Sequence, residues 1–197
     1  MAWKKVLKKI WNFIWNDDSI WSWIVNVILA FVLIKYIIYP GLGLLLGTGF
    51  PIVAVVSSSM EHNNGLDDWF NSQADFYNKI GISKDDFMDF PFKNGFNKGD
   101  IMILKGVNAE NVNVGEVIVF KDGKPDPFIH RVILKWKDNS YHFQTKGDNN
   151  PSSIKTDYLD ETNIKEEQLI GKAVFRIPFL GYIKIWFVEL LSLFHII

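Results

Sequence analysis

The feature that most constrains this chain is an apolar run near its N-terminus. From Ile20 to Tyr39 the sequence is IWSWIVNVILAFVLIKYIIY, in which Lys35 is the one charged residue. A run of about 20 such residues can cross a hydrocarbon core of roughly 30 Å as a helix. A cleavable signal peptide has a shorter apolar region, and a buried helix of a soluble protein is rarely apolar on every side. The run therefore predicts a transmembrane helix, which we assign to residues 19–46.

The charges before this helix predict its orientation. Four lysines precede the apolar run, namely Lys4, Lys5, Lys8 and Lys9. The positive-inside rule then places the N-terminus in the cytoplasm and the chain after residue 46 outside the cell membrane. Residues 1–18 alternate basic and apolar residues in an amphipathic pattern and are expected to lie along the inner membrane surface.

The C-terminal segment 178–197 is also apolar, but Lys184, Glu189 and His195 interrupt it. Its uninterrupted stretches are short for a membrane span. Two expectations stay open: a second helix that crosses the membrane, or a helix that docks on the outer surface. Either arrangement holds the intervening domain close to the lipid.

The middle of the chain, residues 47–177, predicts a mainly β domain. Its short segments are rich in Val, Ile and Phe and are separated by Gly, Asp and Asn, as in DIMILKG, EVIVFKDG and FIHRVILKWKD. Such closely spaced strands favour a partly open, antiparallel, barrel-like sheet. Residues 62–97 are polar with spaced aromatics and predict a small helical insertion.

Composition excludes several classes of function. The chain has no cysteine and a formal net charge of −1. A thiol nucleophile, a disulfide framework and thiolate-bound zinc are therefore excluded, and no basic surface for nucleic acid is indicated. No metal-binding histidine motif is present, so we predict no metal and no cofactor.

The residues that can do chemistry are hydroxyls and histidines. Ser57, Ser58 and Ser59 end an apolar strand just after the membrane helix. Serines in such places more often cap a helix or form a turn, and a nucleophilic serine needs a base beside it. The candidate bases are His62, His130, His142 and His195. We expect His62 to be exposed, and a lone strand histidine such as His130 is more often structural than catalytic.

A polar turn, Lys146-Gly147-Asp148-Asn149-Asn150-Pro151, follows the predicted strand YHFQT. It can be an ordinary hairpin turn. It can also supply an acid that orients a histidine and stabilises the imidazolium, as the third member of a catalytic triad does. Taken singly, none of these motifs identifies a function.

Taken together and in order, the motifs resemble a known family. A membrane helix is followed by SSSMEH, NKGDIMIL with VGEVIVF, IHRVI and TKGDNNP. This pattern, over residues 20 to 185, resembles type I signal peptidases of the archaeal and endoplasmic-reticulum branch, which use His where most bacterial members use Lys. The resemblance implies a serine endopeptidase that removes signal peptides from secretory preproteins after small residues at positions −3 and −1.

The resemblance also implies roles for single residues. Ser59 becomes the nucleophile and His130 the general base. The Ser57 hydroxyl and the Ser59 backbone N–H are expected to stabilise the oxyanion, and Asp148 is expected to be an acid near the site. Membrane lipid and the protein-export translocon are the expected partners besides the substrate.

The sequence departs from the family at the second acid. Relatives carry an aspartate about six residues after the KGDNN aspartate, and Ile154 stands there in this chain. Asp157 is the nearest replacement, with Asp160 behind it. We predict that Asp148 and Asp157 act jointly on His130. Ser58 and His62 also stand where the family often has Gly and Pro.

The strand before Ser59 is expected to bind an extended substrate by strand addition. We predict that Ile52, Val53, Val55 and Met60 line the small apolar pockets that select the −1 and −3 side chains. Two alternative functions stay open, a membrane serine protease with one specialised precursor and a homologue that binds exported peptides without cutting them.

Overall fold

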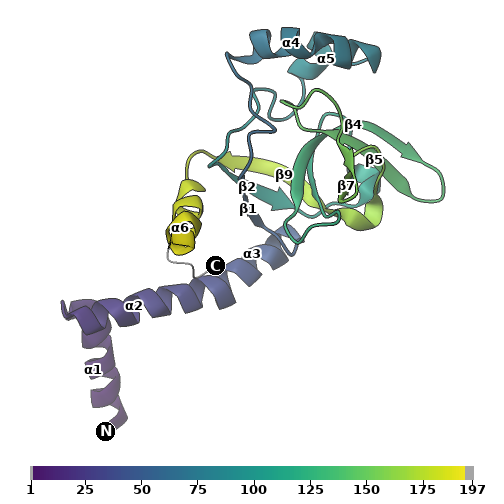
Figure 1. Ribbon diagram of the computed structural model, residues 1–197. Helices are drawn as coiled ribbons and strands as arrows, with labels where there is room; N and C mark the ends of the chain where they lie inside the picture. The colour runs from purple at the N-terminus through teal and green to yellow at the C-terminus, as the bar shows by residue number, and fades with distance from the viewer. Residues whose placement is uncertain (1, 194–197) are drawn as a thin grey trace. The chain divides into compact units, whose positions relative to one another are not determined.

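The computed structural model describes residues 2–193, and these form two compact units that divide between Leu45 and Leu46. The first unit is helical. It contains α1 (Ala2–Asn16), α2 (Ile20–Leu33), a π-helical turn η1 (Ile34–Ile38) and the start of α3 (Tyr39–Leu46) (Figure 1). From Ile20 to Leu46 these segments form one 27-residue helix with a mean hydropathy of 2.1 and no buried residues over its most apolar stretch. Its length and composition suit a membrane span.

Local chemistry explains the ends and the irregular turn of this helix. The Ser19 hydroxyl caps α2 by accepting a hydrogen bond from the Ser22 N–H at 3.2 Å. Pro40 lacks an N–H, and its ring crowds the carbonyl four residues earlier, which fits the π turn just before it. Asn26 is the strongly polar residue of the run, and its Nδ2 donates to the Ile14 carbonyl of α1 at 2.9 Å.

The second unit is built on a seven-stranded antiparallel sheet, as predicted. Its strand order is β1-β2-β9-β3-β4-β5-β8, so β1 and β8 are the edges. Figure 1 shows the sheet curling into a partly open barrel. The strands are β1 (Ile52–Ala54), β2 (Ile101–Lys105), β3 (Val117–Phe120), β4 (Phe128–Lys137), β5 (Tyr141–Lys146), β8 (Ile164–Lys165) and β9 (Leu169–Ile177). The short 3₁₀ turns η2 (Ala109–Asn111) and η3 (Glu166–Gln168) join strands.

A two-residue hairpin, β6 (Lys155–Thr156) with β7 (Leu159–Asp160), forms a separate ladder. Neither these two strands nor β8 is among the strands expected from the sequence. Strands of two residues are too short to produce the alternation of apolar and polar residues that identifies longer strands. The hairpin matters because Glu161 follows it directly.

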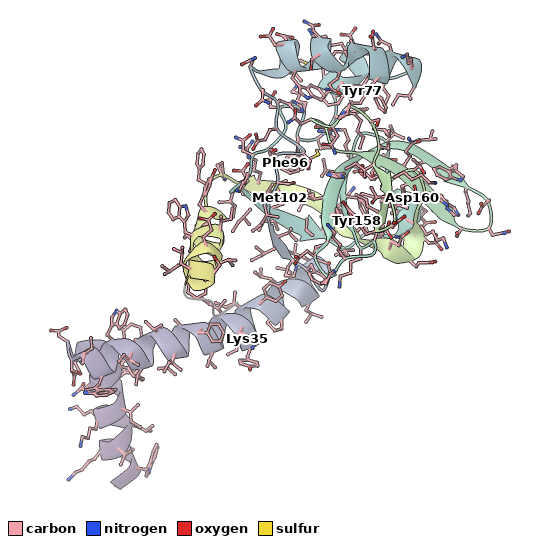
Figure 2. The ribbon with its side chains drawn as sticks, in the orientation of Figure 1. Lys35, Tyr77, Phe96, Met102, Tyr158 and Asp160 are labelled. Atoms are coloured by element: carbon pink, nitrogen blue, oxygen red, sulfur yellow. The ribbon has the colours of Figure 1, made fainter. Side chains whose placement is uncertain are left out.

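Two apolar clusters fill the inside of the curled sheet. The first includes Val55, Met60, Phe96 and Met102, and the second includes Ile118, Phe120 and Phe143. Figure 2 labels Phe96 and Met102 in this interior. Burial of apolar side chains stabilises the folded state by about 25 cal/mol for each Å² removed from water. The two clusters therefore help to fix the ends of the strands that carry the polar residues described below.

The helical insertion is confirmed as α4 (Leu66–Lys79) and α5 (Lys84–Met88). Ser83 begins α5 with a capping box, in which Ser83 and Asp86 bond each other's backbone N–H. Four aromatic side chains of the insertion, Trp69, Phe70, Tyr77 and Phe87, are buried together with Ile133 of β4. The insertion is thus a second small core, which covers the outer face of β4.

The helix α6 (Tyr182–Leu193) follows β9 and has 12 residues. The described residues of this helix correspond to a length of about 18 Å. His195 lies outside the described residues.

Candidate active site

Ser59 and His130 lie together although 71 residues separate them in the sequence. The His130 Nε2 is 2.9 Å from the Ser59 Oγ. His130 is on β4, where it pairs with Ile118 of β3, and its ring packs edge-on against Phe120. Its side chain is 6% exposed. A serine hydroxyl that contacts an enclosed imidazole nitrogen is the arrangement from which the histidine can take the serine proton.

A second hydroxyl near this pair belongs to Ser57. Its Oγ lies 3.1 Å from the Ser59 Oγ, and its side chain is exposed to solvent. The Ser57 hydroxyl therefore lies beside the Ser59 Oγ, the oxygen that would attack a substrate carbonyl carbon.

Glu161 is the residue that sequence reasoning missed. Its Oε1 is 2.5 Å from the His130 Nδ1, so the carboxylate lies on the opposite side of the ring from Ser59. The side chain is fully buried. No pattern in the sequence marks this glutamate, because it follows a two-residue strand and stands 13 positions after Asp148.

Asp148, which we predicted to act on His130, binds other partners. Its carboxylate accepts hydrogen bonds from the Arg131 Nε at 2.8 Å and Nη2 at 2.7 Å. The His62 Nε2 is 2.9 Å from Oδ2 of the same carboxylate. Burial raises the pKa of Asp148, but the Arg131 charge and the hydrogen bonds from His62 and Arg131 outweigh it and lower the pKa to about 2.

In contrast to the prediction, the structure therefore does not bring Asp148 and Asp157 together at His130. β4 explains the difference, because successive side chains of a strand point to opposite faces. His130 points toward Ser59, whereas Arg131 and its partner Asp148 lie on the face covered by the insertion, where the Arg131 guanidinium packs over the Phe87 ring. Asp157 is exposed in the β6–β7 turn. Asp160 forms an ion pair with Lys155 at 2.8 Å.

His62 is also placed differently from the expectation that it is exposed. Its side chain is 1% exposed, and its ring stacks on the Trp69 indole with centroids 3.6 Å apart and planes at 4°. The Trp69 Nε1 in turn donates to the Asp148 carbonyl at 3.2 Å. His62 therefore joins the insertion to the KGDNN turn.

The KGDNN turn holds the backbone around Ser59. The Asn149 N–H donates to the Ser59 carbonyl at 2.8 Å, and the Asn149 Nδ2 donates to the Ser58 carbonyl at 3.2 Å. A Cβ on Gly147 would lie 2.9 Å from the Ser59 carbonyl oxygen and 3.0 Å from the Ser59 Cβ. Such contacts are too short, so glycine is needed where this turn passes Ser59.

Lys146 is a buried lysine in the same turn. Its Nζ donates to the Gly147 and Asp148 carbonyls and lies 5.1 Å from the centroid of the Tyr77 ring. Burial lowers the pKa of Lys146 to about 8, although the negative charges of Asp148 and Glu161 act to raise it. Its contacts with backbone carbonyls help to fix the shape of the turn.

The four residues predicted to bind substrate do not share one surface. Val55 and Met60 are enclosed in the interior, and the Met60 sulfur accepts a hydrogen bond from the Asp148 N–H at 3.4 Å. Val53 packs against the same cluster, while Ile52 is partly exposed. Alternation along a strand puts Val53 and Val55 on the inner face. The opposite face carries Ile52, Ala54 and the exposed Val56.

His142, the remaining candidate base, lies at the other end of β5. Its Nδ1 is 2.6 Å from the Asn163 Oδ1, and its Nε2 is 3.2 Å from the Asp138 Oδ1. It is therefore a structural residue of the β4–β5 hairpin end.

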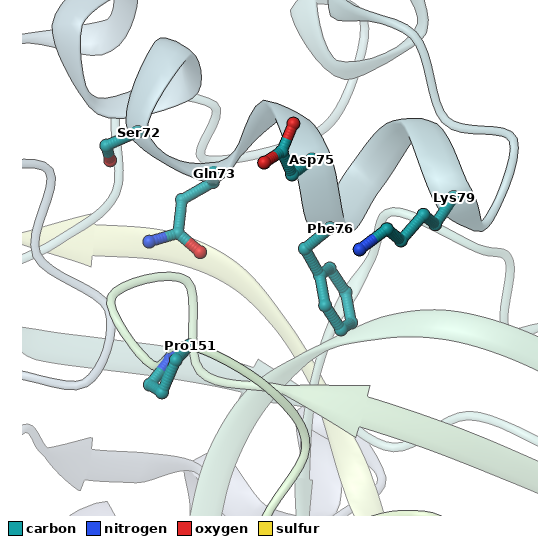
Figure 3. Close-up of a pocket in the computed structure, with 6 residues that line it drawn as sticks. All are labelled: Ser72, Gln73, Asp75, Phe76, Lys79 and Pro151. Carbon is teal, nitrogen blue, oxygen red and sulfur yellow. The ribbon is translucent and has the colours of Figure 1, made fainter.

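A shallow hollow of about 290 Å³ opens between α4 and the end of the KGDNN turn (Figure 3). Four polar or charged residues, one aromatic residue and one proline line it, namely Ser72, Gln73, Asp75, Lys79, Phe76 and Pro151. It contains neither the serine nor the histidine of the reactive pair, so it is distinct from them.

The amino-acid sequence is similar to catalytic subunits of signal peptidase complexes. No protein-family model matches the chain. The human signal peptidase complex catalytic subunit SEC11C is 30% identical over 152 residues, which is 75% of this chain and 62% of that protein. The catalytic subunit SEC11 of Komagataella phaffii is 29% identical over 163 residues, which is 78% of this chain and 76% of that protein. SEC11 of Yarrowia lipolytica is 28% identical over 163 residues.

The chain thus spans about three fifths of the length of the mammalian relatives that it matches. The similarity accompanies a barrel-like sheet with a hydrogen-bonded serine and histidine and an apolar N-terminal helix. The chain is therefore similar to the SEC11 catalytic subunits of signal peptidase complexes over about three quarters of its own length.

Proposed function

We propose that the chain is a membrane-bound serine endopeptidase that removes N-terminal signal peptides from secreted preproteins, after small residues at positions −3 and −1. The 2.9 Å contact between the Ser59 Oγ and the His130 Nε2 carries this proposal. Relatives named as catalytic subunits of the signal peptidase complex support the substrate class.

Ser59 is the nucleophile and His130 the general base in this mechanism. The His130 Nε2 accepts the hydroxyl proton as the Ser59 Oγ attacks the scissile carbonyl, and it returns a proton to the leaving amine. The Ser59 backbone N–H and the Ser57 hydroxyl stabilise the oxyanion. The 3.1 Å separation of the two serine oxygens supports this role of Ser57.

The edge of the sheet offers a binding site for an extended substrate. β1 pairs with β2 on one side and is an edge of the sheet among the described residues, so its other side can pair with an added strand. Ile52 and the exposed Val56 lie on the face that points away from the interior. We infer that these two residues contact the small side chains at −1 and −3.

Membrane attachment brings the nucleophile to the cleavage site. Ser59 follows the end of α3 at Leu46 by 13 residues (59 − 46). A chain of this length spans at most about 45 Å when fully extended. A signal peptide lies in the membrane with its cleavage site just outside, so Ser59 is within reach of that plane.

The proposed orientation follows from the four N-terminal lysines. The N-terminus is cytoplasmic, and the β domain lies outside the cell membrane. Lipid and the protein-export translocon are then the proposed partners, because the substrate emerges from the translocon into the same membrane.

Cleavage of a precursor with an Ala-x-Ala site tests this proposal. We expect detergent-solubilised wild type to cut after the second Ala and the Ser59→Ala variant to leave the precursor intact. If both proteins cut, Ser59 is not the nucleophile. If neither cuts, the peptide-binding alternative is favoured, and binding of the intact precursor to the wild type then tests it.

A further inference from the structure

We propose that Glu161 is the carboxylate that orients His130 and stabilises its protonated ring. This inference rests on the proposed peptidase function and assigns a positioning residue to it. Asp148 then has a structural role, and Asp157 has none in the reaction.

The three side chains form a continuous series of contacts. The Glu161 Oε1 is 2.5 Å from the His130 Nδ1, and the His130 Nε2 is 2.9 Å from the Ser59 Oγ. A carboxylate accepts hydrogen bonds, so the His130 Nδ1 carries a proton and donates a hydrogen bond to Glu161. Nε2 is then the unprotonated nitrogen that faces the serine, which is the tautomer that general-base catalysis requires.

Other hydrogen bonds fix the carboxylate in this position. Oε1 also accepts from the Thr145 Oγ1 at 3.0 Å, and Oε2 accepts from the Ile154 N–H at 2.7 Å. A buried carboxylate is costly to keep ionised unless it is hydrogen-bonded. These two donors, together with the His130 ring, supply that compensation.

The backbone of Glu161 is held by the same two neighbours. Its N–H donates to the Ile154 carbonyl at 2.9 Å, and its carbonyl accepts from the Thr145 N–H at 2.8 Å. Residue 161 is thus fixed beside the end of β5, and its side chain extends toward β4. This explains how a glutamate outside the KGDNN turn reaches His130.

The position of Ile154 shows why the departure from the family pattern is tolerated. Its side chain packs against the apolar cluster that includes Phe120 and Phe143. Its backbone N–H meets the second oxygen of Glu161. A carboxylate is therefore present where residue 154 approaches the site, although residue 154 itself is apolar.

The proton movements leave Glu161 charged throughout. The Ser59 proton passes to the His130 Nε2 as the bond from Oγ to the substrate carbonyl carbon forms. The imidazolium then carries a positive charge between the tetrahedral oxyanion and the Glu161 carboxylate. The Nδ1 proton stays on His130, so Glu161 acts by orientation and charge.

The test is Glu161→Gln, which keeps the size of the side chain and removes its charge. We expect kcat to fall by roughly 10⁴-fold, as for triads that lose the carboxylate on their histidine. KM should stay within a few-fold because Glu161 does not touch the substrate. Glu161→Asp should recover part of the lost kcat. Glu167→Gln, at an exposed glutamate, is the matched control and should behave as wild type.

The outcomes separate this inference from the proposed function. If wild type cuts, Ser59→Ala does not, and Glu161→Gln keeps wild-type kcat, the role of Glu161 is overturned while the peptidase function stands. Loss of kcat in Asp157→Asn with Glu161→Gln unaffected would overturn it in the same way. An inactive wild type argues against the peptidase function instead.

A measurement without activity keeps the inference testable if Glu161→Gln does not fold. In ¹⁵N-labelled wild type we expect a low-field exchangeable proton that is bonded to the His130 Nδ1. The signal should vanish in His130→Gln and persist in Glu167→Gln. Absence of this signal from folded wild type would overturn the hydrogen bond on which the inference stands.

Discussion

Two histidine–carboxylate pairs lie on opposite faces of β4 and differ in their third partner. The His130 Nδ1 is 2.5 Å from the Glu161 Oε1, and the His130 Nε2 contacts the Ser59 hydroxyl. His62 is 2.9 Å from Asp148, whose carboxylate also binds Arg131. Its ring stacks on Trp69, and its Nδ1 is buried without a hydrogen-bond partner in the described part of the chain. A buried histidine beside a carboxylate therefore does not by itself identify a catalytic base.

The comparison teaches that the two pairs have different tasks. The His130 pair has the Ser59 hydroxyl within reach, so under the proposed function its loss should lower the rate of cleavage. The His62 pair joins the insertion, the KGDNN turn and the segment just after Ser59, so its loss should lower stability. Four predictions test this difference, from the largest effect to the smallest.

The largest expected effect is on catalysis. His130→Gln should lower kcat for precursor cleavage by roughly 10²–10⁴-fold, because general-base assistance is lost. His62→Gln should change kcat by less than tenfold and lower the thermal unfolding midpoint instead. Steady-state kinetics and thermal unfolding of both variants check the prediction. Equal losses of kcat would mean that the two histidines are not functionally distinct.

The second effect is on stability. Asp148→Asn leaves the buried Arg131 charge without its partner, and breaking a buried ion pair in this way costs about 3–5 kcal/mol. The free energy of unfolding in denaturant should fall by that amount. Asp67→Asn removes a surface ion pair with Lys84 and should cost less than about 1 kcal/mol. Similar losses in both variants would contradict the structural role of Asp148.

The third effect is the acid dependence of stability. The pKa of Asp148 is lowered to about 2 in the folded protein, against 3.8 for an unperturbed aspartate. Between about pH 2 and pH 3.8 the folded state therefore binds fewer protons than the unfolded state. The stabilisation, about 2–3 kcal/mol, is present above pH 3.8 and is lost as the pH falls toward 2. Denaturant unfolding at several pH values should show this loss in wild type and a smaller one in Asp148→Asn.

The smallest effect concerns the turn that joins the two sites. Gly147→Ala would place a Cβ 2.9 Å from the Ser59 carbonyl oxygen. The backbone must shift, at a cost of about 1–3 kcal/mol, and kcat should fall with stability because Ser59 moves. Gly49→Ala is the control, since a Cβ there meets no atom within 4 Å. An unchanged kcat in Gly147→Ala would show that the turn does not position Ser59.

The sequence by itself determined the segments whose signal is local. The apolar run over residues 20–39 indicates a membrane helix because length and hydropathy alone decide that property. Clustered Val, Ile and Phe between turn residues indicated the antiparallel sheet, and the order of short motifs singled out Ser59 and His130. The structure brings these two side chains to 2.9 Å.

Only the tertiary structure decided which carboxylate meets His130. Glu161 is 31 residues away in the sequence and follows a hairpin too short to leave a periodic pattern. Which face of β4 receives Asp148 depends on strand alternation together with the insertion that buries Arg131. Buried polar groups choose partners across the whole fold, because each must be hydrogen-bonded wherever a complementary group lies. Spacing along the chain therefore does not encode these contacts.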